Sequence, residues 1–269
     1  MPATATALHT SDDPILLRRD AGGIATITLN RPKQYNSLSE ELLSELQSTL
    51  EAIGRDASVR VVVIAGAGAA FCAGHDLKQM RANPRKAYYD KLFAQCSDVM
   101  MRLLHLPQPV IARVHGIATA AGCQLVAQCD LAVASDAARF AVSGITVGLF
   151  CSTPSVSLGR NVSRKQAMEM LLTGDFIDAA TAKECGLVNR VVPANQLDAE
   201  VKALADAVIR KSSVAVATGK NMFYKQMEMG MQAAYAYAAE VMACNMMAQD
   251  VGEGIDAFMQ KRPPQWKNS

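Results

Sequence analysis

The chain has 269 residues with a formal net charge of +2 at pH 7; half of the residues are apolar and 19% are charged. This composition is typical of one folded globular domain, with or without an appendage, and excludes an intrinsically disordered chain. The near-neutral charge, without a basic cluster interleaved with aromatic residues, argues against a nucleic-acid partner. No apolar run approaches the ~18–20 residues that cross a bilayer, so no membrane segment is expected.

The seven cysteines are odd in number and scattered, and no two form a C-x-x-C pair. Their apolar neighbours predict that most are small buried side chains in a reducing compartment. No cluster of histidine, cysteine or carboxylate has metal-ligand spacing, so no metal site is predicted. Residues 1–11 contain no arginine and no apolar stretch. They resemble neither a signal peptide nor a transit peptide, which predicts a cytoplasmic protein.

Strand and helix signals alternate through the first half of the chain. Residues 24–29 are apolar and β-branched and end at Asn30-Arg31-Pro32, which predicts a strand. Ser39 is a candidate N-cap for a helix whose apolar stripe is Leu42, Leu43, Leu46, Leu50 and Ile53. Residues 59–65 are apolar apart from Arg60, as in a strand that is buried on both faces.

The same alternation continues beyond this strand. Residues 88–106 predict a helix that ends at Pro107, and residues 110–114 predict the next strand. A small-residue turn and a short helix follow, and residues 131–134 predict a further strand, with Asp130 in a structural position at its start. These repeated strand–helix units predict an α/β fold.

The pattern changes after Pro193, because residues 195–260 predict helices only. The predicted organisation is therefore a core over residues 1–194 and a helical region over residues 195–269. Seven methionines lie between Met222 and Met247. They are interpreted as a helical layer packed on its own core or on a neighbouring subunit; an adaptable apolar binding surface is the alternative.

Two small-residue turns carry the strongest functional signal. One is Phe71-Cys72-Ala73-Gly74-His75-Asp76-Leu77-Lys78, and the other runs from His115 to Leu125. Each reads as a strand end, a tight turn and a helix start, where backbone N–H groups lack intrahelical partners. Two such turns together can form an oxyanion hole. The alternative is that the small residues merely allow a helix and a strand to pack closely.

The two turns, with other segments in the same order, resemble the crotonase (enoyl-CoA hydratase/isomerase) superfamily over nearly the whole chain. The other segments are Thr28–Lys33, Asn36–Leu38, Val61–Gly66, Cys129–Ala134, Leu172–Gly174, Gly186–Asn189 and Lys261–Pro263. The run Val147–Pro154 resembles a subgroup called enoyl-CoA hydratase domain-containing proteins. The resemblance implies a ClpP-like spiral of ββα units, with C-terminal helices that assemble a homotrimer or a dimer of trimers.

The resemblance also implies an acyl-CoA or enoyl-CoA thioester as substrate, with coenzyme A as part of the substrate and no separate cofactor. The oxyanion donors are then the backbone N–H groups of His75 and Ala121; a catalytic His75 imidazole is the lesser alternative. Residues implied to contact coenzyme A are Lys33, Ala73, His75, Asp76, Leu77, Lys78 and Lys261. The lysines suit a phosphate-rich ligand, although a single lysine is more often a solvated surface charge.

Family hydratases use two glutamates, one as base and one as acid, on either side of a water. The corresponding positions here are Gln124 and Gly144. An amide accepts no proton at neutral pH, although it can orient a water. Each acid–base residue contributes about 10²–10⁴-fold to the reaction rate, and the effects of losing two such residues do not simply multiply. Efficient hydration is therefore not expected.

Other residues can be considered in place of the glutamates. Cys151 is a candidate nucleophile, with a buried structural thiol as the alternative. Asp90 and Asp98 are candidates for proton transfer. Two functions remain open: an enzyme, nominally an enoyl-CoA hydratase or isomerase that works through an enolate-type oxyanion, and a catalytically silent acyl-CoA-binding or assembly protein.

Overall fold

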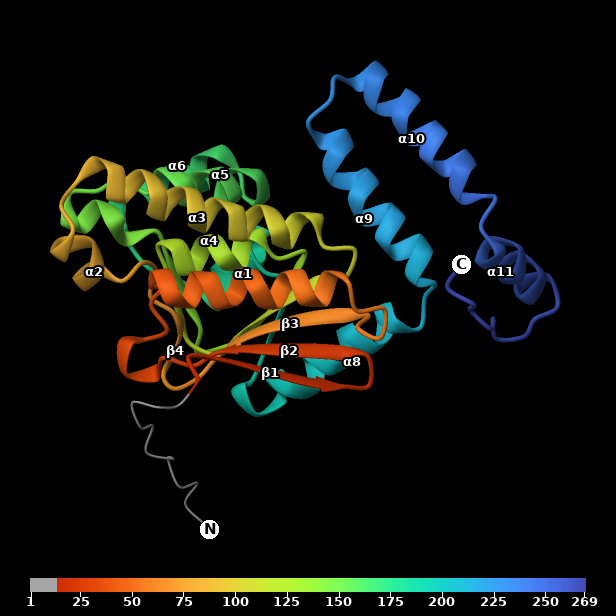
Figure 1. The fold of residues 1–269 in the computed structure, drawn as a ribbon, viewed down its shortest axis with the longest axis horizontal. Coiled ribbons are helices and arrows are strands. Elements are labelled where there is room, and N and C mark those ends of the chain that lie inside the picture. Colours follow the sequence, from red (N-terminus) through yellow and green to blue (C-terminus); the bar gives the residue numbers. More distant parts are fainter. Residues whose placement is uncertain (1–13) are drawn as a thin grey trace, which may run out of the picture.

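The computed structural model describes residues 14–269, and it contains two sheets in a layered α/β arrangement (Figure 1). The prediction for residues 1–11 lies outside the described residues. The larger sheet has the strand order β1 (Leu16–Ala21), β2 (Ile24–Leu29), β3 (Val61–Gly66), β5 (Val110–Val114), β7 (Leu131–Ser135), β10 (Arg190–Val192). The smaller sheet has the order β4 (Ala70–Cys72), β6 (Ile117–Thr119), β8 (Arg139–Ala141), β9 (Ile177–Asp178).

The strand pairing confirms the predicted spiral of ββα units. A strand of the larger sheet is followed directly by a strand of the smaller sheet in β3–β4, β5–β6 and β7–β8. The pairs are parallel except β1 with β2 and β8 with β9, which are antiparallel. Helices therefore make the crossovers that parallel neighbours need.

One face of the larger sheet is covered by α1 (Glu40–Gly54) and α3 (Lys86–His105), which pack against each other. The hydroxyl of Ser39 accepts a hydrogen bond of 3.3 Å from the N–H of Leu42, so the predicted N-cap is confirmed. The predicted apolar stripe of α1 is fully buried. Hydrophobic burial of this stripe holds α1 on the sheet.

The opposite face of the sheet is covered by α8 (Leu197–Ile209). Val61 and Val63 of β3 pack with Leu197 and Val201 of this helix, whereas Val62 belongs to the main core on the other side. The strand is thus buried on both faces, as its continuous apolar run predicts.

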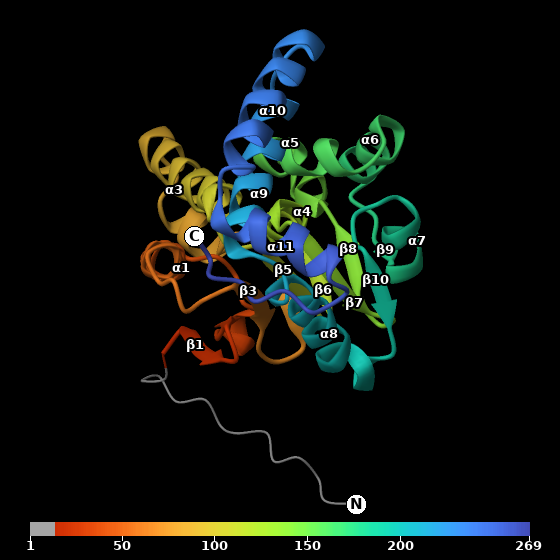
Figure 2. The ribbon, with the colours of Figure 1, turned by 90° about the vertical axis from the view of Figure 1, so that its right-hand side faces the viewer.

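Three C-terminal helices extend away from the sheets: α9 (Ser213–Met227), α10 (Met231–Asn245) and α11 (Gln249–Met259) (Figures 1 and 2). The boundary predicted at residues 194–195 precedes α8, which still packs on the sheet, so the extended part begins only at α9. The independence of the two predicted parts stays a prediction.

A buried ion pair attaches α9 to the core. Lys220 Nζ lies 2.7 Å from a carboxylate oxygen of Asp130 and also donates to the carbonyl oxygens of Leu103 and Gln108. Tyr224 donates to the other oxygen of Asp130, and the N–H of Val110 donates to the same oxygen as Lys220. The structural role predicted for Asp130 is confirmed.

The remaining helices surround the smaller sheet or connect strands. They are α2 (Leu77–Ala82), α4 (Ala121–Gln128), α5 (Ser152–Asn161), α6 (Arg164–Thr173), α7 (Ala179–Glu184) and short 3-10 turns at Pro32–Gln34, Ser143–Val147 and Ala194–Gln196. Over residues 14–269, no helix is long and apolar enough to cross a membrane.

Candidate functional site

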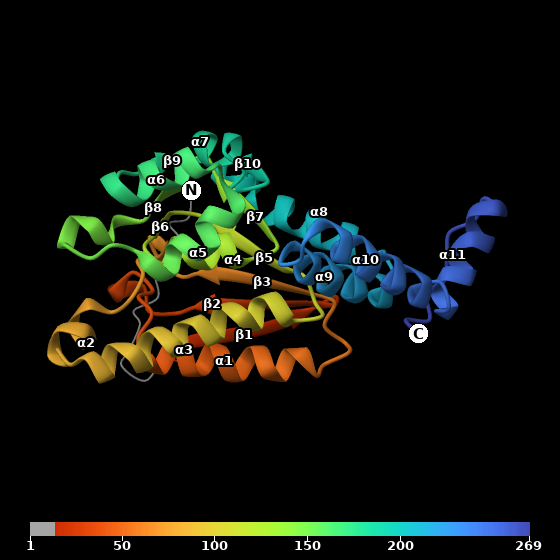
Figure 3. The same cartoon turned by 90° about the horizontal axis from the view of Figure 1, so that it is seen from above.

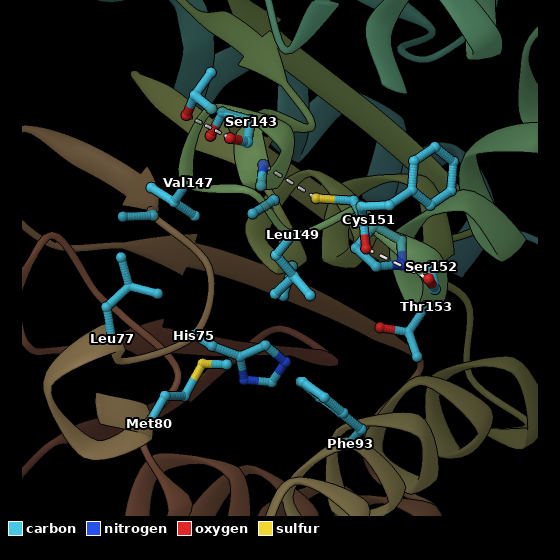
Figure 4. Close-up of a pocket in the computed structure, with 17 residues that line it drawn as sticks. His75, Leu77, Met80, Phe93, Ser143, Val147, Leu149, Cys151, Ser152 and Thr153 are labelled. Carbon is cyan, nitrogen blue, oxygen red and sulfur yellow. Dashed lines mark hydrogen bonds between the residues drawn. The ribbon is translucent and has the colours of Figure 1, made fainter. Parts of the chain in front are cut away.

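A cavity of about 190 Å³ lies where the two small-residue turns meet the segment that connects β8 to α5 (Figure 4). Its lining is mostly apolar and consists of Ala73, His75, Leu77, Met80, Phe93, Ala120, Ala121, Ser143, Gly144, Thr146, Val147, Leu149, Phe150, Cys151, Ser152, Thr153 and Pro154. A concave apolar site with a few polar groups is typical of small-molecule binding.

The turn at His75 is fixed by the segment that contains Asn36. Asn36 has a left-handed φ of 56° and donates from Nδ2 to the carbonyl oxygens of Ala67 and Ala70, at 2.8 Å each. Leu38 then brackets His75, because its N–H donates to Gly74 and its carbonyl oxygen accepts from Asp76. The backbone N–H of His75 itself has no hydrogen-bond partner among the described residues.

The second turn places the start of α4 against the first. Gly122 has no room for a side chain, because a Cβ there would lie 2.1 Å from the carbonyl oxygen of Cys72. A Cβ on Gly74 would lie 3.1 Å from the backbone nitrogen of Ala121, so the two turns are in direct contact. In residues 14–269 the N–H of Ala121, the first residue of α4, also has no partner. Two unpartnered N–H groups thus belong to adjoining turns of one cavity wall.

Strain at this wall is concentrated in Ala120. Its backbone has φ 50° and ψ −122°, a conformation that favours glycine. Its N–H donates to the carbonyl oxygen of Ala141 at 3.0 Å, and its own carbonyl oxygen accepts from the N–H of Gln124. These bonds hold the residue in place and aim the start of α4 at the cavity.

The side chain of His75 also reaches the cavity (Figure 4). Its ring packs edge to face against Phe93, with 5.5 Å between the ring centroids. Both ring nitrogens are buried and make no hydrogen bond of good geometry within the described part of the chain, although the Leu38 backbone lies close enough to the ring to oppose the effect of burial on its pKa. Burial lowers the pKa of His75 to about 4, so the imidazole is neutral at pH 7.

The residues expected to contact coenzyme A divide into two groups. Ala73, His75 and Leu77 line the cavity. Asp76 instead caps α2 by accepting from the N–H of Lys78 at 3.1 Å, and it pairs with Arg31 at 3.0 Å. Asp76 therefore shapes the turn, and the Arg31 guanidinium helps to hold the pKa of its carboxyl below the usual range against the opposing effect of burial.

The three lysines of that prediction do not lie together. Lys33 and Lys78 are exposed near the first turn, on the 3-10 turn and on α2. Lys261 follows α11, and α11 lies at the opposite end of the molecule from α2 (Figures 1 and 3). A single chain therefore does not bring Lys261 to this cavity.

The two positions implied for the glutamates lie in different surroundings. Gln124 is 3% exposed and does not line the cavity, and its Oε1 has no hydrogen-bond partner in the described chain. Gly144 does line the cavity, but a Cβ there would lie 2.6 Å from the carbonyl oxygen of Leu149. The loop as folded accommodates no side chain at this position.

None of the described residues that line the cavity carries a carboxylate. Asp90 is paired with Lys86 on the surface at 2.8 Å, and Asp98 is exposed. Neither lines the cavity, so the structure does not support a proton-transfer role for them there. The base and acid of a two-glutamate hydratase have no counterpart in the lining.

Cys151 does line the cavity, as a buried thiol. Its sulfur accepts a hydrogen bond from the N–H of Gly144, and burial raises the pKa of the thiol. No histidine in residues 14–269 is hydrogen-bonded to it, so no base activates it. Burial likewise raises the pKa of Cys72, Cys96 and Cys123 to about 12, which agrees with structural thiols.

No cluster suited to a metal ion occurs among the described residues.

Several lining residues were not singled out from the sequence. Phe93 comes from α3, Met80 from α2, and Thr153 from the start of α5. Ser143 lies 2.7 Å, hydroxyl to hydroxyl, from Thr119. No local motif marks these side chains, because only the fold brings them to one cavity.

Comparison with known proteins decides the family. The sequence pattern of the family described as enoyl-CoA hydratase/isomerase matches residues 19–269. The chain belongs to this family. A crystal structure of an enoyl-CoA hydratase from Mycobacterium smegmatis is 58% identical, with a TM-score of 0.93 over 94% of this chain and 99% of that one.

Members of this family called enoyl-CoA hydratase domain-containing protein 3 are also similar. The crystal structure of the human protein is 44% identical, with a TM-score of 0.91 over 94% of this chain and all of that one. The mitochondrial mouse protein is 44% identical over 99% of this chain and 89% of its own length. The crotonase fold and the subgroup resemblance are thus confirmed. The cytoplasmic location stays a prediction, and the mitochondrial name of the mouse relative does not support it.

Proposed function

We propose that this protein is an enzyme that binds an acyl-CoA thioester in the cavity, with the thioester carbonyl oxygen between the N–H groups of His75 and Ala121. The observation that carries the proposal is that these two N–H groups are unpartnered and belong to adjoining turns of one apolar cavity. Backbone N–H groups fixed in this way stabilise an oxygen that becomes negative during reaction.

The two donors would act when the thioester carbonyl oxygen gains negative charge. That charge forms in an enolate, once a base from outside the described lining has taken the proton next to the carbonyl, or in a tetrahedral intermediate, once water has added to the carbonyl carbon. Each donor is typically worth about 3–4 kcal/mol in the barrier. The apolar lining keeps the local dielectric low, which strengthens both hydrogen bonds. The small cavity favours a short acyl group near the thioester.

The reaction itself is proposed to be something other than efficient hydration. Hydration needs one group that takes a proton from water and another that gives a proton to the substrate. The described lining contains no carboxylate that could do either. Isomerisation, through an enolate, and thioester hydrolysis, through a tetrahedral intermediate, both place negative charge on the thioester oxygen and remain the candidate steps. The same absence favours the second function, a silent acyl-CoA-binding or assembly protein that uses the donors only for binding.

Assembly into a homotrimer or a dimer of trimers is part of the proposal. The extended helices expose large apolar side chains, among them Met231, Tyr235, Met242, Met247 and Phe258. Such a surface is typical of a protein interface. A neighbouring subunit would also give Lys261 a place near the phosphates of coenzyme A that Lys33 and Lys78 would attract. Light scattering of the purified protein tests the assembly.

The carbonyl contact is tested without altering the protein. Calorimetric titration compares butyryl-CoA with its thioether analogue, S-butyl-CoA, which lacks the carbonyl oxygen. Two hydrogen bonds at about 0.5–1.5 kcal/mol each predict that the thioester binds roughly 5- to 150-fold more tightly. Free coenzyme A is the control for the nucleotide contribution. Equal affinity of the thioester and the thioether would contradict the oxyanion site.

A further inference from the structure

The end of β6 places strained backbone in the cavity wall, and the proposed function does not explain what keeps it there. Ala120 follows β6 directly and has φ 50° and ψ −122°, a combination that favours glycine. The ψ angle of Ala120 sets the direction of the next peptide group, whose N–H belongs to Ala121. Strain of this kind persists only where the surrounding structure holds it.

Two hydrogen bonds join this strained residue and its neighbour to the end of β8. β6 and β8 are parallel, and their last paired residues are Thr119 and Ala141. Beyond this pair, the N–H of Ala120 donates to the carbonyl oxygen of Ala141 at 3.0 Å. The second bond is between side chains, because the hydroxyl oxygens of Thr119 and Ser143 lie 2.7 Å apart. A side-chain bond thus continues the attachment past the point where the two strands end.

We propose that Thr119 and Ser143 are positioning residues, and that their hydroxyl–hydroxyl bond holds the peptide between Ala120 and Ala121 with its N–H directed into the cavity. This inference rests on the proposed function, in which that N–H is one of the two donors to the thioester oxygen. The pair acts through the backbone, and it neither takes a proton from the substrate nor gives one to it.

Ser143 is a firm anchor for this bond in the cavity wall (Figure 4). Its carbonyl oxygen accepts a hydrogen bond of 2.7 Å from the hydroxyl of Thr146 in the same 3-10 turn. The next residue, Gly144, donates to the sulfur of Cys151. On the other side the turn packs against the end of α6, where a Cβ on Gly174 would lie 3.4 Å from the Cα of Ser143. The turn is therefore fixed independently of β6.

Thr119 provides the informative position for a test, because it is not among the residues that line the cavity. A change in its hydroxyl can reach a ligand only through the wall. Valine shares the β-branched shape of threonine and lacks the hydroxyl. Without the bond, Ala120 is expected to relax toward negative φ, which turns the N–H of Ala121 away from the cavity.

Calorimetric titration of the full-length protein with butyryl-CoA and S-butyl-CoA tests this inference, because the ratio of the two affinities isolates the carbonyl contact. Thr119→Val is expected to lower this ratio about two- to tenfold, as the loss of one hydrogen bond implies. Ser143→Ala and the double variant Thr119→Val/Ser143→Ala should give the same ratio as Thr119→Val, since all three break one bond. Thr119→Ser, which keeps the hydroxyl, should retain the ratio of the unaltered protein.

Relief of the strain gives an independent readout. In the Ala120→Gly protein, Thr119→Val should lower the ratio less than it does with alanine at this position, because glycine adopts the same φ without strain. An equally large fall with glycine and with alanine would overturn the inference, since the bond would then not be holding a strained residue.

Ser157→Ala is the matched control for a merely structural effect. The hydroxyl of Ser157 donates to Oε1 of Gln128 at the last residue of α4, so it too attaches α4 to its surroundings, but at the end away from Ala121. Ser157 is buried, so the control should lower stability and leave the ratio unchanged. The ratio compares two ligands on one protein, so a smaller folded fraction affects both affinities alike.

The outcomes separate this inference from the proposed function. An unchanged ratio in Thr119→Val, or an equal fall in Ser157→Ala, overturns the inference alone. Equal affinity of the unaltered protein for butyryl-CoA and S-butyl-CoA overturns the proposed oxyanion site, and the inference with it.

Discussion

The N–H of Gly144 donates a hydrogen bond of 3.2 Å to the sulfur of Cys151, and a Cβ on Gly144 would lie 2.7 Å from that sulfur. The loop is therefore folded around the Cys151 thiol at the position that the family resemblance assigns to the hydratase acid. The whole loop, as folded, leaves no room for a side chain at residue 144. Restoring a glutamate at residue 144 alone would not rebuild a hydratase site.

Gly144→Ala is expected to destabilise the protein by roughly 1–3 kcal/mol, because the added methyl overlaps a backbone carbonyl and a buried sulfur. Urea unfolding measures this change. The double variant Gly144→Ala/Cys151→Ala should recover only part of the loss, since the carbonyl oxygen of Leu149 stays 2.6 Å from the new Cβ. Gly159→Ala in α5 is the control, because nothing lies within 4 Å of a Cβ there. An unchanged stability of Gly144→Ala would show that the loop rearranges freely.

Ala120→Gly is expected to stabilise the protein by about 1 kcal/mol. The native φ of 50° with ψ −122° strains alanine by roughly 1–3 kcal/mol, whereas glycine costs about 0.5–1 kcal/mol of extra chain entropy. The denaturant midpoint of the variant is compared with that of the unaltered protein. A lower midpoint for Ala120→Gly would mean that the methyl contact with the first turn outweighs the backbone strain.

The stability of the protein is expected to fall between pH 6.5 and pH 4 because of His75. Its ordinary pKa is 6.5 and burial lowers it to about 4, so in this window the unfolded chain binds a proton that the folded chain excludes. From pH 7.5 to pH 4.5 the loss amounts to roughly 2–3 kcal/mol, and no change from His75 occurs above pH 7.5.

Unfolding free energies of the unaltered protein and of His75→Gln across this range measure the His75 contribution. The difference between the two proteins removes the effect of the carboxylates, which are common to both. The unfolding free energies of the two proteins should change with pH at the same slope above pH 7.5 and diverge below pH 6.5. Parallel profiles throughout would show that His75 titrates normally in the folded state.

Lys220→Met is expected to cost roughly 3–5 kcal/mol, because it leaves the carboxylate of Asp130 buried without its counter-ion. The Lys220 and Asp130 side chains are 6% and 13% exposed. Hydrogen exchange should show that α9 opens more readily in the variant. The matched control is Lys202→Met, which breaks an exposed pair with Asp206 and should change stability by less than about 1 kcal/mol. Similar losses in both variants would contradict a special role for the buried pair.

Much of the larger sheet and its helices could be predicted from local pattern. The strand expected over residues 24–29 coincides with β2, and that over residues 110–114 coincides with β5. The cap at Ser39 is a direct chemical signal. In contrast, β4, β6 and β8 have three residues each, too few to show a period. Their stability comes from pairing with strands far away in the sequence, which no local window contains.

The candidate site was predictable only where a turn motif marks it. The turns at His75 and Ala121 carry glycines whose close approach is now visible, at Gly74 and Gly122. The side of the cavity formed by Phe93 and by the residues around Thr153 results from packing of separate helices. The packing of separate helices also decides where Lys261 lies. Its local motif therefore did not reveal that, within one chain, Lys261 is far from the cavity.

The most direct test of the central claim combines calorimetric binding of crotonyl-CoA with a steady-state assay of its hydration. Binding is expected to be measurable, because the two N–H groups proposed as donors, at His75 and Ala121, have no other partner among the described residues. Hydration is expected to be at least ~10³-fold slower than in a family member with both glutamates, since base and acid are absent from the described lining. Hydration at a rate comparable to that relative, or no binding of crotonyl-CoA at all, would contradict the claim.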